Sequence, residues 1–170
     1  MLDAGQLETE RLIVRPFVRE DEAKLVAMFA DHRVARFVGE GTALSPQEAA
    51  LWVSNSRENL RQYGYGTGAV VLRATGEVIG WAGIARPPDD EQEVIYGFAH
   101  AHWGKGYGTE LLGALIAFWQ ERHPAMVLRA TVDPLNTASV AMLTRKGFRL
   151  EQAAYEDDEC DLYVLPAPGA

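Results

Sequence analysis

The feature that most constrains the fold is segment 102–110, which reads HWGKGYGTE. Its three alternating glycines lead directly into a helical pattern, in which apolar residues recur at three- and four-residue steps: Leu111, Leu112, Leu115, Phe118 and Trp119. Glycine lets backbone N–H groups approach a ligand closely, and a helix start offers unpaired N–H groups at its positive end. With Lys105 as a cation in the loop, the segment predicts a phosphate or pyrophosphate site.

Two common phosphate-binding motifs do not fit this segment. A dinucleotide fingerprint that starts at Gly104 needs a glycine at position 109, where Thr109 stands. A P-loop needs Ser or Thr directly after the Gly-Lys pair, where Gly106 stands. A plain strand-to-helix turn, whose glycines serve tight geometry alone, stays open as the alternative.

The letters WGKGYGTE resemble the acetyl-CoA pyrophosphate loop of GNAT N-acetyltransferases, especially the RimJ/RimL-like branch. The superfamily pattern consists of Arg or Gln, two residues, Gly, one residue, and then Gly or Ala. Here Gly106 and Gly108 take the glycine places. Trp103 takes the first place, which departs from the superfamily pattern but is usual in this branch. Segment 7–16, LETERLIVRP, resembles the start of the same proteins. The resemblance implies acetyl-CoA as cofactor, with contacts from Phe98, Ala99, His100, Trp103, Gly104, Lys105, Gly106, Tyr107, Gly108, Thr109, Asn136 and Ser139.

Length and composition limit the partners. The 170 residues are 48% hydrophobic and 24% charged, which predicts a single domain over residues 1–170. Its 16 basic and 24 acidic residues give a net charge of −8, which argues against nucleic acid and favours a cationic acceptor. The single cysteine, Cys160, and an N-terminus without an apolar secretory core favour the cytoplasm. The apolar run 111–119 is too short to span a membrane.

The periodicities predict an α/β or α+β fold, with a mixed, mostly antiparallel sheet and about four helices in the order β-α-α-β-β-β-α-β-α-β-β. This order matches the GNAT fold. We expect strands at 7–17, 68–73, 77–84, 94–99, 127–133, 148–155 and 160–165, and helices from 20, at 46–62, after the glycine loop and at 137–146. Segment 31–44 looks irregular. Ser45, Pro46 and Glu48 form a capping box, and Gly97 predicts a bulge or a close approach.

Asn136, Ser139 and the pair Gly147-Phe148 resemble the second cofactor segment of the family, in which the Asn faces pantetheine and the helix flanks the thiol. From the residues alone, Asn136 is a helix N-cap and Gly147 a C-cap, and both interpretations can hold together. Many GNAT enzymes carry a Tyr seven residues after this Asn as the acid for the departing thiolate. Leu143 stands there instead. In RimJ/RimL-like relatives the Ser equivalent to Ser139 can sit near the CoA sulfur, so the resemblance implies that the Ser139 hydroxyl is the best donor left.

Glu93, Tyr96 and Ser139 are the candidate catalytic residues. Glu93 and Tyr96 match the Glu-x-Gly-Tyr stretch of the branch, with Ile95 in place of its Gly. A carboxylate on this strand could accept the amine proton directly or through water, and the alternative is a solvated strand residue. Because their spacing is odd, we expect Glu93 and Tyr96 to face opposite sides.

Other reactive side chains give weaker signals. His100 and His102 lack a third ligand nearby, so we expect no metal. Cys160 has acidic neighbours that do not lower its pKa, which argues against a nucleophilic role. The acidic run 156–159 reads as a solvated turn or as a border of the acceptor entrance.

The resemblance implies acetyl transfer from acetyl-CoA to a primary amine by direct attack. A protein or peptide N-terminal α-amine is favoured over lysine, because its pKa is about 7.7–8.0 rather than about 10.4, although a small amine stays open. The alternatives are a CoA-binding regulatory or catalytically vestigial module and a nucleotide-phosphate binder. The sequence leaves a homodimer open.

Overall fold

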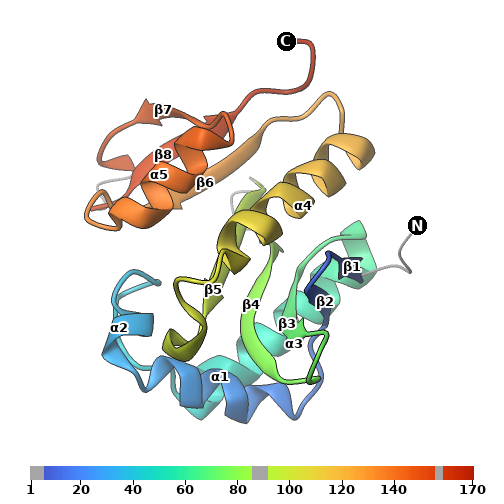
Figure 1. The fold of residues 1–170 in the computed structure, drawn as a ribbon, viewed down its shortest axis with the longest axis vertical. Helices are drawn as coiled ribbons and strands as arrows, with labels where there is room; N and C mark the ends of the chain where they lie inside the picture. The colour runs from blue at the N-terminus through green and yellow to red at the C-terminus, as the bar shows by residue number, and fades with distance from the viewer. Residues whose placement is uncertain (1–5, 86–91, 156–158) are drawn as a thin grey trace.

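The computed structural model describes residues 6–85, 92–155 and 159–170 (Figure 1). The strands are β1 (Leu7–Glu8), β2 (Leu12–Pro16), β3 (Thr67–Leu72), β4 (Val78–Ala85), β5 (Glu93–Phe98), β6 (Leu128–Val132), β7 (Arg149–Gln152) and β8 (Asp161–Leu165). The helices are α1 (Asp21–Phe29), α2 (His32–Ala35), α3 (Pro46–Tyr63), α4 (Tyr107–Arg122) and α5 (Thr137–Arg145), with a 3-10 turn η1 (His100–His102).

The eight described strands form one sheet in the order β1-β2-β3-β4-β5-β6-β8-β7. Every neighbouring pair is antiparallel except β5 and β6, which are parallel. The predicted mixed, mostly antiparallel α/β fold is therefore confirmed.

Strands β5 and β6 separate soon after they meet. They pair at a single position, Glu93 with Arg129, and then diverge (Figure 1). Helix α4 follows β5 and helix α5 follows β6, and the two helices touch across the split. A Cβ added at Gly108 of α4 would lie 3.3 Å from the sulfur of Met142 in α5. The split therefore opens a space between the starts of two helices.

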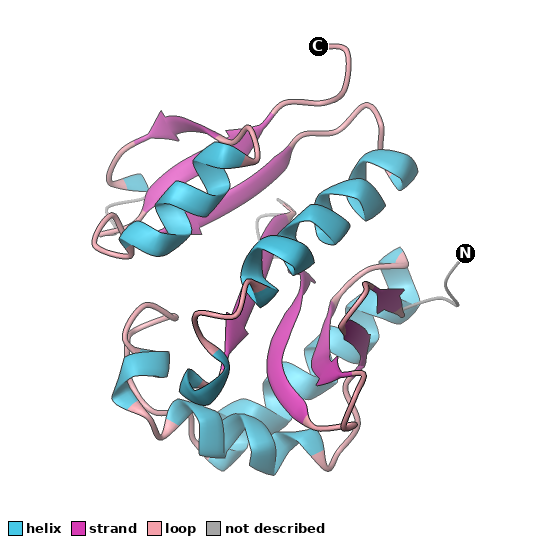
Figure 2. Cartoon of the chain, in the orientation of Figure 1, coloured by secondary structure: helices cyan, strands magenta, loops and turns pink. Residues whose placement is uncertain are grey.

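Two hydrophobic clusters hold helices on both faces of the sheet (Figure 2). Val70 packs with α4 residues, including Trp119, whereas the adjacent Ala69 packs with Phe29 of α1 and Val53 of α3. Neighbouring strand residues point to opposite faces, so one strand contributes to both clusters. Each large apolar side chain buried in this way stabilises the fold by roughly 1.5–3 kcal/mol.

The predicted capping box is confirmed at the start of α3. The Ser45 hydroxyl accepts from the Glu48 N–H at 3.1 Å, and the Glu48 carboxylate accepts from the Ser45 N–H at 3.1 Å. Gly64 closes the helix with φ at 77°. None of the helices within the described residues is long and apolar enough to cross a membrane.

Three details differ from the sequence-based expectation. The strand expected at 7–17 is broken into β1 and β2, because residues 9–11 turn toward α4. Segment 31–44 contains the short helix α2, capped by the Asp31 carboxylate on the Arg33 N–H at 3.0 Å. The described residues therefore hold five α-helices rather than about four, since four helical residues are too few to show a period.

Gly97 in β5 marks a close approach rather than a bulge. The β4–β5 register is continuous, and a Cβ at Gly97 would lie 2.0 Å from the ring of Trp81. Only glycine leaves room for this indole, which forms part of the wall of the pocket described below.

Candidate active site

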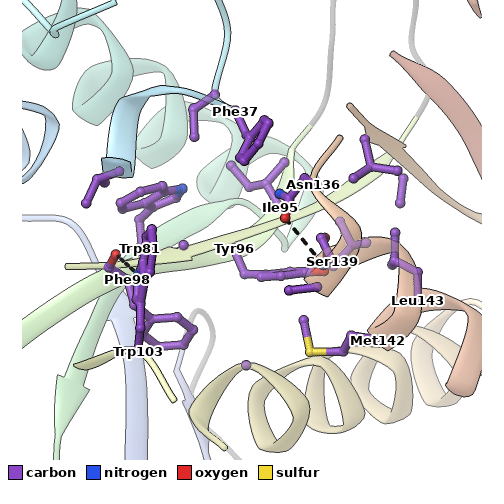
Figure 3. A pocket seen from close by; sticks show the side chains of 18 of the residues that line it. Phe37, Trp81, Ile95, Tyr96, Phe98, Trp103, Asn136, Ser139, Met142 and Leu143 are labelled. Atoms are coloured by element: carbon purple, nitrogen blue, oxygen red, sulfur yellow. Dashed lines mark hydrogen bonds between the residues drawn. The ribbon is translucent and has the colours of Figure 1, made fainter. Parts of the chain in front are cut away.

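A pocket of about 850 Å³ occupies the split between β5 and β6 (Figure 3). Its walls come from α2 and the residues after it, from β5 and β6, from the glycine loop with the start of α4, and from the start of α5. Segments distant in sequence therefore converge on one space, and the two helix starts present the positive ends of their dipoles there.

The glycine loop has the backbone that a pyrophosphate site requires. Gly104 and Gly106 have φ angles of 74° and 80°, a region that L side chains rarely adopt, and Gly106 is the N-cap of α4. The Trp103 indole donates to the Phe98 carbonyl at 2.8 Å and ties the loop to the end of β5. Unpaired N–H groups at the start of α4 are thus available to an anion.

A brace from the N-terminal region supports this loop from behind. Glu110 accepts from the Thr9 hydroxyl at 2.5 Å, the Arg11 N–H at 3.0 Å and the Arg11 Nε at 2.7 Å. Arg11 also donates to the Lys105 carbonyl at 2.9 Å and stacks over the Tyr107 ring at 4.5 Å. Burial alone would raise the pKa of Glu110, but the hydrogen bonds from Thr9 and Arg11 outweigh it and lower that pKa. The sequence did not predict this role of Arg11, although the segment Thr9-Glu10-Arg11 belongs to the stretch that resembles the start of RimJ/RimL-like proteins.

The pocket wall contains most of the residues that the resemblance assigned to the cofactor. They are Phe98, Trp103, Gly104, Gly106, Tyr107, Gly108, Thr109, Asn136 and Ser139. Ala99, His100 and Lys105 do not belong to that wall. The His100 ring packs on Trp103 at 4.7 Å, and the Lys105 carbonyl turns toward Arg11. The cofactor roles of all twelve residues stay predictions.

Tyr96 and Ser139 meet in the middle of the pocket. The phenol oxygen lies 2.7 Å from Ser139 Oγ, and Figure 3 shows the Tyr96 ring of β5 beside Ser139 of α5. Burial raises the pKa of Tyr96, and the hydrogen bond to Ser139 lowers it by less. The phenol therefore keeps its proton at neutral pH.

Asn136 serves as the N-cap of α5 while it lines the pocket. Its side-chain oxygen accepts from the Ser139 N–H at 3.4 Å. The capping interpretation is thus confirmed, and the cap fixes the first turn that carries the Ser139 hydroxyl. Leu143 is buried at 1% exposure in the main core, so position 143 has no acid to offer.

Glu93 lies at the closed end of the split. Its carboxylate accepts from the Thr131 N–H at 3.2 Å and from the Thr131 hydroxyl. It is the only carboxylate among the described residues that line the pocket. Tyr96 lines the same pocket about 10 Å further along the strand. We expected Glu93 and Tyr96 to face opposite sides of the sheet. Both nevertheless line the pocket, because β5 borders the split between β5 and β6.

The histidines show no metal arrangement. His102 lines the pocket, and its Nε2 lies 3.3 Å from the Glu77 carboxylate. Its Nδ1 is buried and meets no hydrogen-bond partner in the described parts of the chain. In those parts, no three His, Cys, Asp or Glu side chains cluster as ligands. The absence of a metal stays a prediction.

The resemblance implied a wall from the region of residues 31–62, but the sequence did not indicate which of its residues line the pocket. Arg33, Arg36 and Phe37, from α2 and the residues after it, line the pocket together with Trp52 and Trp81. A helix of four residues is too short to show a hydrophobic period in the sequence. The adjacent Arg36 and Phe37 were therefore the only hint that this segment lines a pocket.

Comparison with known proteins now places the chain. A family model described as an acetyltransferase (GNAT) domain matches residues 11–149. The chain belongs to the GNAT acetyltransferase family. This acetyltransferase superposes on the crystal structure of an acetyltransferase from Agrobacterium tumefaciens strain C58 with a TM-score of 0.83, at 28% identity, over 96% of this chain and 95% of that one.

Two further relatives support the assignment. The N-acetyltransferase p20 of Bacillus licheniformis is 25% identical over 147 residues, which cover 85% of this chain and 83% of p20. A RimL ribosomal L7/L12 α-N-protein acetyltransferase in complex with CoA shares the fold at 17% identity, with a TM-score of 0.75 over 94% of this chain and 96% of that one. The predicted GNAT membership is confirmed, the RimL protein shows the same fold, and the GNAT domain uses acetyl-CoA.

The residues present fit this donor. Gly104 and Gly106 hold a backbone conformation that suits close approach, and the start of α4 supplies N–H donors. His102, whose Nδ1 meets no hydrogen-bond partner among the described residues, lies in the same wall. The pocket also continues beyond the loop, because its wall includes Ser139 and Glu93 as well as Gly104.

Proposed function

We propose that residues 1–170 form one N-acetyltransferase domain that moves an acetyl group from acetyl-CoA to the α-amine of a peptide, a protein N-terminus or a small molecule. The observation that carries the proposal is the Tyr96–Ser139 hydroxyl pair at 2.7 Å, placed beyond the glycine loop in the same pocket. A binding module needs the loop alone, whereas an acyl transferase also needs a proton donor at the thioester.

Acetyl-CoA supplies an acyl group that is already activated as a thioester. The protein therefore has to bind, orient and move protons. We assign the N–H groups of residues 106–109 to the pyrophosphate, and the first turn of α5 to the sulfur end. The positive end of the α5 dipole favours negative charge beside Ser139.

Ser139 and Tyr96 take the place of the missing Tyr acid. With acetyl-CoA bound, the Ser139 hydroxyl would donate its proton to the departing thiolate, and the Tyr96 phenol, 2.7 Å from Ser139 Oγ, would supply a proton to Ser139 in turn. Because burial raises the pKa of Tyr96, the phenol is protonated at the pH where an α-amine attacks.

Glu93 is the proposed base for the incoming amine. It is the only carboxylate in the described wall. Because it lies about 10 Å along the strand from Tyr96, we propose that a water carries the proton from the attacking amine beside Tyr96 to Glu93. Such an indirect base suits an α-amine, which loses its proton more easily than a lysine side chain by about 2.5 pKa units.

The test measures thiol release from acetyl-CoA with a panel of α-amines and ε-amines. We expect turnover with α-amines, and Glu93→Gln should lower kcat by about 10²-fold without changing the Kd for CoA. Tight CoA binding with no thiol release from any amine would favour the regulatory module. Faster reaction of ε-amines would overturn the acceptor assignment.

A further inference from the structure

The pocket and the whole chain carry opposite charge. The chain has a net charge of −8, yet the charged side chains in the described pocket wall are Arg33, Arg36, Arg145 and Glu93. A molecule bound in the pocket is therefore surrounded by more positive than negative side chains, although the net charge of the whole chain is negative.

The three arginines are not equivalent. Arg33 forms a two-pronged ion pair with Asp31, with its Nε and Nη2 at 2.9 and 2.6 Å from the two carboxylate oxygens. This pair lowers the pKa of Asp31 to about 2, so the charge of Arg33 is balanced. Arg145 lies in the last turn of α5, about 9 Å along the helix from Ser139.

Arg36 is the cation left on the α2 side. Its guanidinium stacks over the Phe37 ring at 4.7 Å, and no carboxylate in the described parts of the chain pairs with it. Stacking on an aromatic ring holds the guanidinium plane and leaves its N–H edge available. An oriented arginine of this kind binds a carboxylate through two parallel hydrogen bonds.

The α2 side is also the side away from the donor. Figure 3 shows Phe37 on one side of the Tyr96–Ser139 pair and Met142 on the other. Met142 adjoins Gly108 in the first turn of α4, where we place the pyrophosphate. Phe37 and Arg36 thus line the half of the pocket that an acceptor amine would enter.

We propose that the acceptor carries a carboxylate close to its amine and that Arg36 binds this carboxylate. The inference rests on the proposed function, since it names the substrate class of the same site. It differs from the cationic acceptor that the net charge predicts. Net charge acts over a Debye length on the encounter, whereas Arg36 acts at contact on the bound acceptor.

The test uses three peptides that share their N-terminal residue: Ala-Glu, Ala-Gln and Ala-Lys, each with an amidated C-terminus. The wild-type kcat/KM should fall by about tenfold from the Glu to the Gln peptide and further for the Lys peptide. Arg36→Gln should remove the ranking, and Arg36→Glu should reverse it. Arg61→Gln, which changes an exposed arginine of α3 outside the pocket wall, is the matched control and should keep the ranking.

Each other result has a definite meaning. Equal kcat/KM for the three peptides, or a preference for the Lys peptide, would overturn the carboxylate proposal and leave acetyl transfer standing. A parallel rise in the Kd for CoA in Arg36→Gln would assign Arg36 to the donor and overturn the proposal too. No transfer to any peptide or amine would overturn the proposed function itself.

Discussion

The paired hydroxyls of Tyr96 and Ser139 lead to the first prediction. Tyr96→Phe keeps the ring in its cluster and removes only the phenol oxygen, so the proton behind Ser139 is lost. We expect kcat to fall by about 10²-fold, with a smaller loss for Ser139→Ala, while the Kd for CoA holds. Steady-state kinetics and calorimetric titration with CoA give the two numbers. Undiminished kcat in both variants would remove the pair from the mechanism.

Gly106 leads to the second prediction, because its φ of 80° penalises any side chain. Gly64 has a similar φ of 77° at the end of α3, outside the pocket wall, and serves as the matched control. Replacing either glycine with Ala should lower the free energy of unfolding by about 1–2 kcal/mol. Only Gly106→Ala should also weaken CoA binding, measured by titration. Equal CoA affinity in the two variants would argue against the loop as the phosphate site.

The contact between the N-terminal strands and helix α4 leads to the third prediction. Arg11→Gln breaks the ion pair with Glu110 and the bond to the Lys105 carbonyl, both of which hold the loop. We expect the KM for acetyl-CoA to rise by about tenfold, while kcat holds. The measurement is repeated with S-acetylpantetheine, which lacks the pyrophosphate.

This shorter donor separates positioning from general damage. If Arg11 acts through the pyrophosphate loop, Arg11→Gln and the wild type should use S-acetylpantetheine with equal kcat/KM. Arg11→Lys should restore part of the acetyl-CoA KM, because it keeps the charge. Equal losses with both donors would mean that the brace serves only stability.

The junction of β2 and α1 leads to the fourth prediction. Asp21 is 1% exposed and accepts from Arg15 at 2.7 and 3.0 Å and from the Val18 N–H at 2.8 Å. Burial alone would raise the pKa of Asp21, but these bonds outweigh it and lower the pKa below 3.8. Asp21→Asn should therefore lower the free energy of unfolding by about 2–3 kcal/mol in denaturant titrations.

The pH dependence of this junction has a definite sign. Because the native pKa of Asp21 lies below the unfolded value, its contribution is present above pH 3.8 and is lost as the pH falls through the native pKa. The difference between wild type and Asp21→Asn should shrink in that acid range. Glu58→Gln, at an exposed ion pair in α3, should change stability little at any pH. A difference that stays constant into the acid range would contradict this account.

Local signals in the sequence predicted the elements well. The capping box at Ser45 and the glycine loop before α4 depend on neighbours within a few residues. Gly97 could be predicted because a glycine inside a strand often marks a place without room for a Cβ. Helix α2 was not predicted, because its four residues are too few to show a helical period of apolar side chains.

Contacts between distant segments could not be predicted. Tyr96 meets Ser139 across 43 positions and Arg11 meets Glu110 across 99, and no local pattern encodes either pair. The split between β5 and β6 brings Glu93 and Tyr96 into one pocket despite their odd spacing. Net charge likewise gave no guide to the arginines in the pocket wall, because it sums over the whole surface.

The chain as a whole belongs to the GNAT acetyltransferases, and we propose that its transfer step occurs beside the Tyr96–Ser139 pair. The most direct test follows CoA thiol and acetylated product together, with acetyl-CoA and an α-amine peptide at neutral pH, in wild type and Tyr96→Phe. The account predicts equal amounts of thiol and N-acetyl peptide from the wild type, and both about 10²-fold slower from the variant. Thiol release without acetylated peptide, or identical rates in the two proteins, would contradict it.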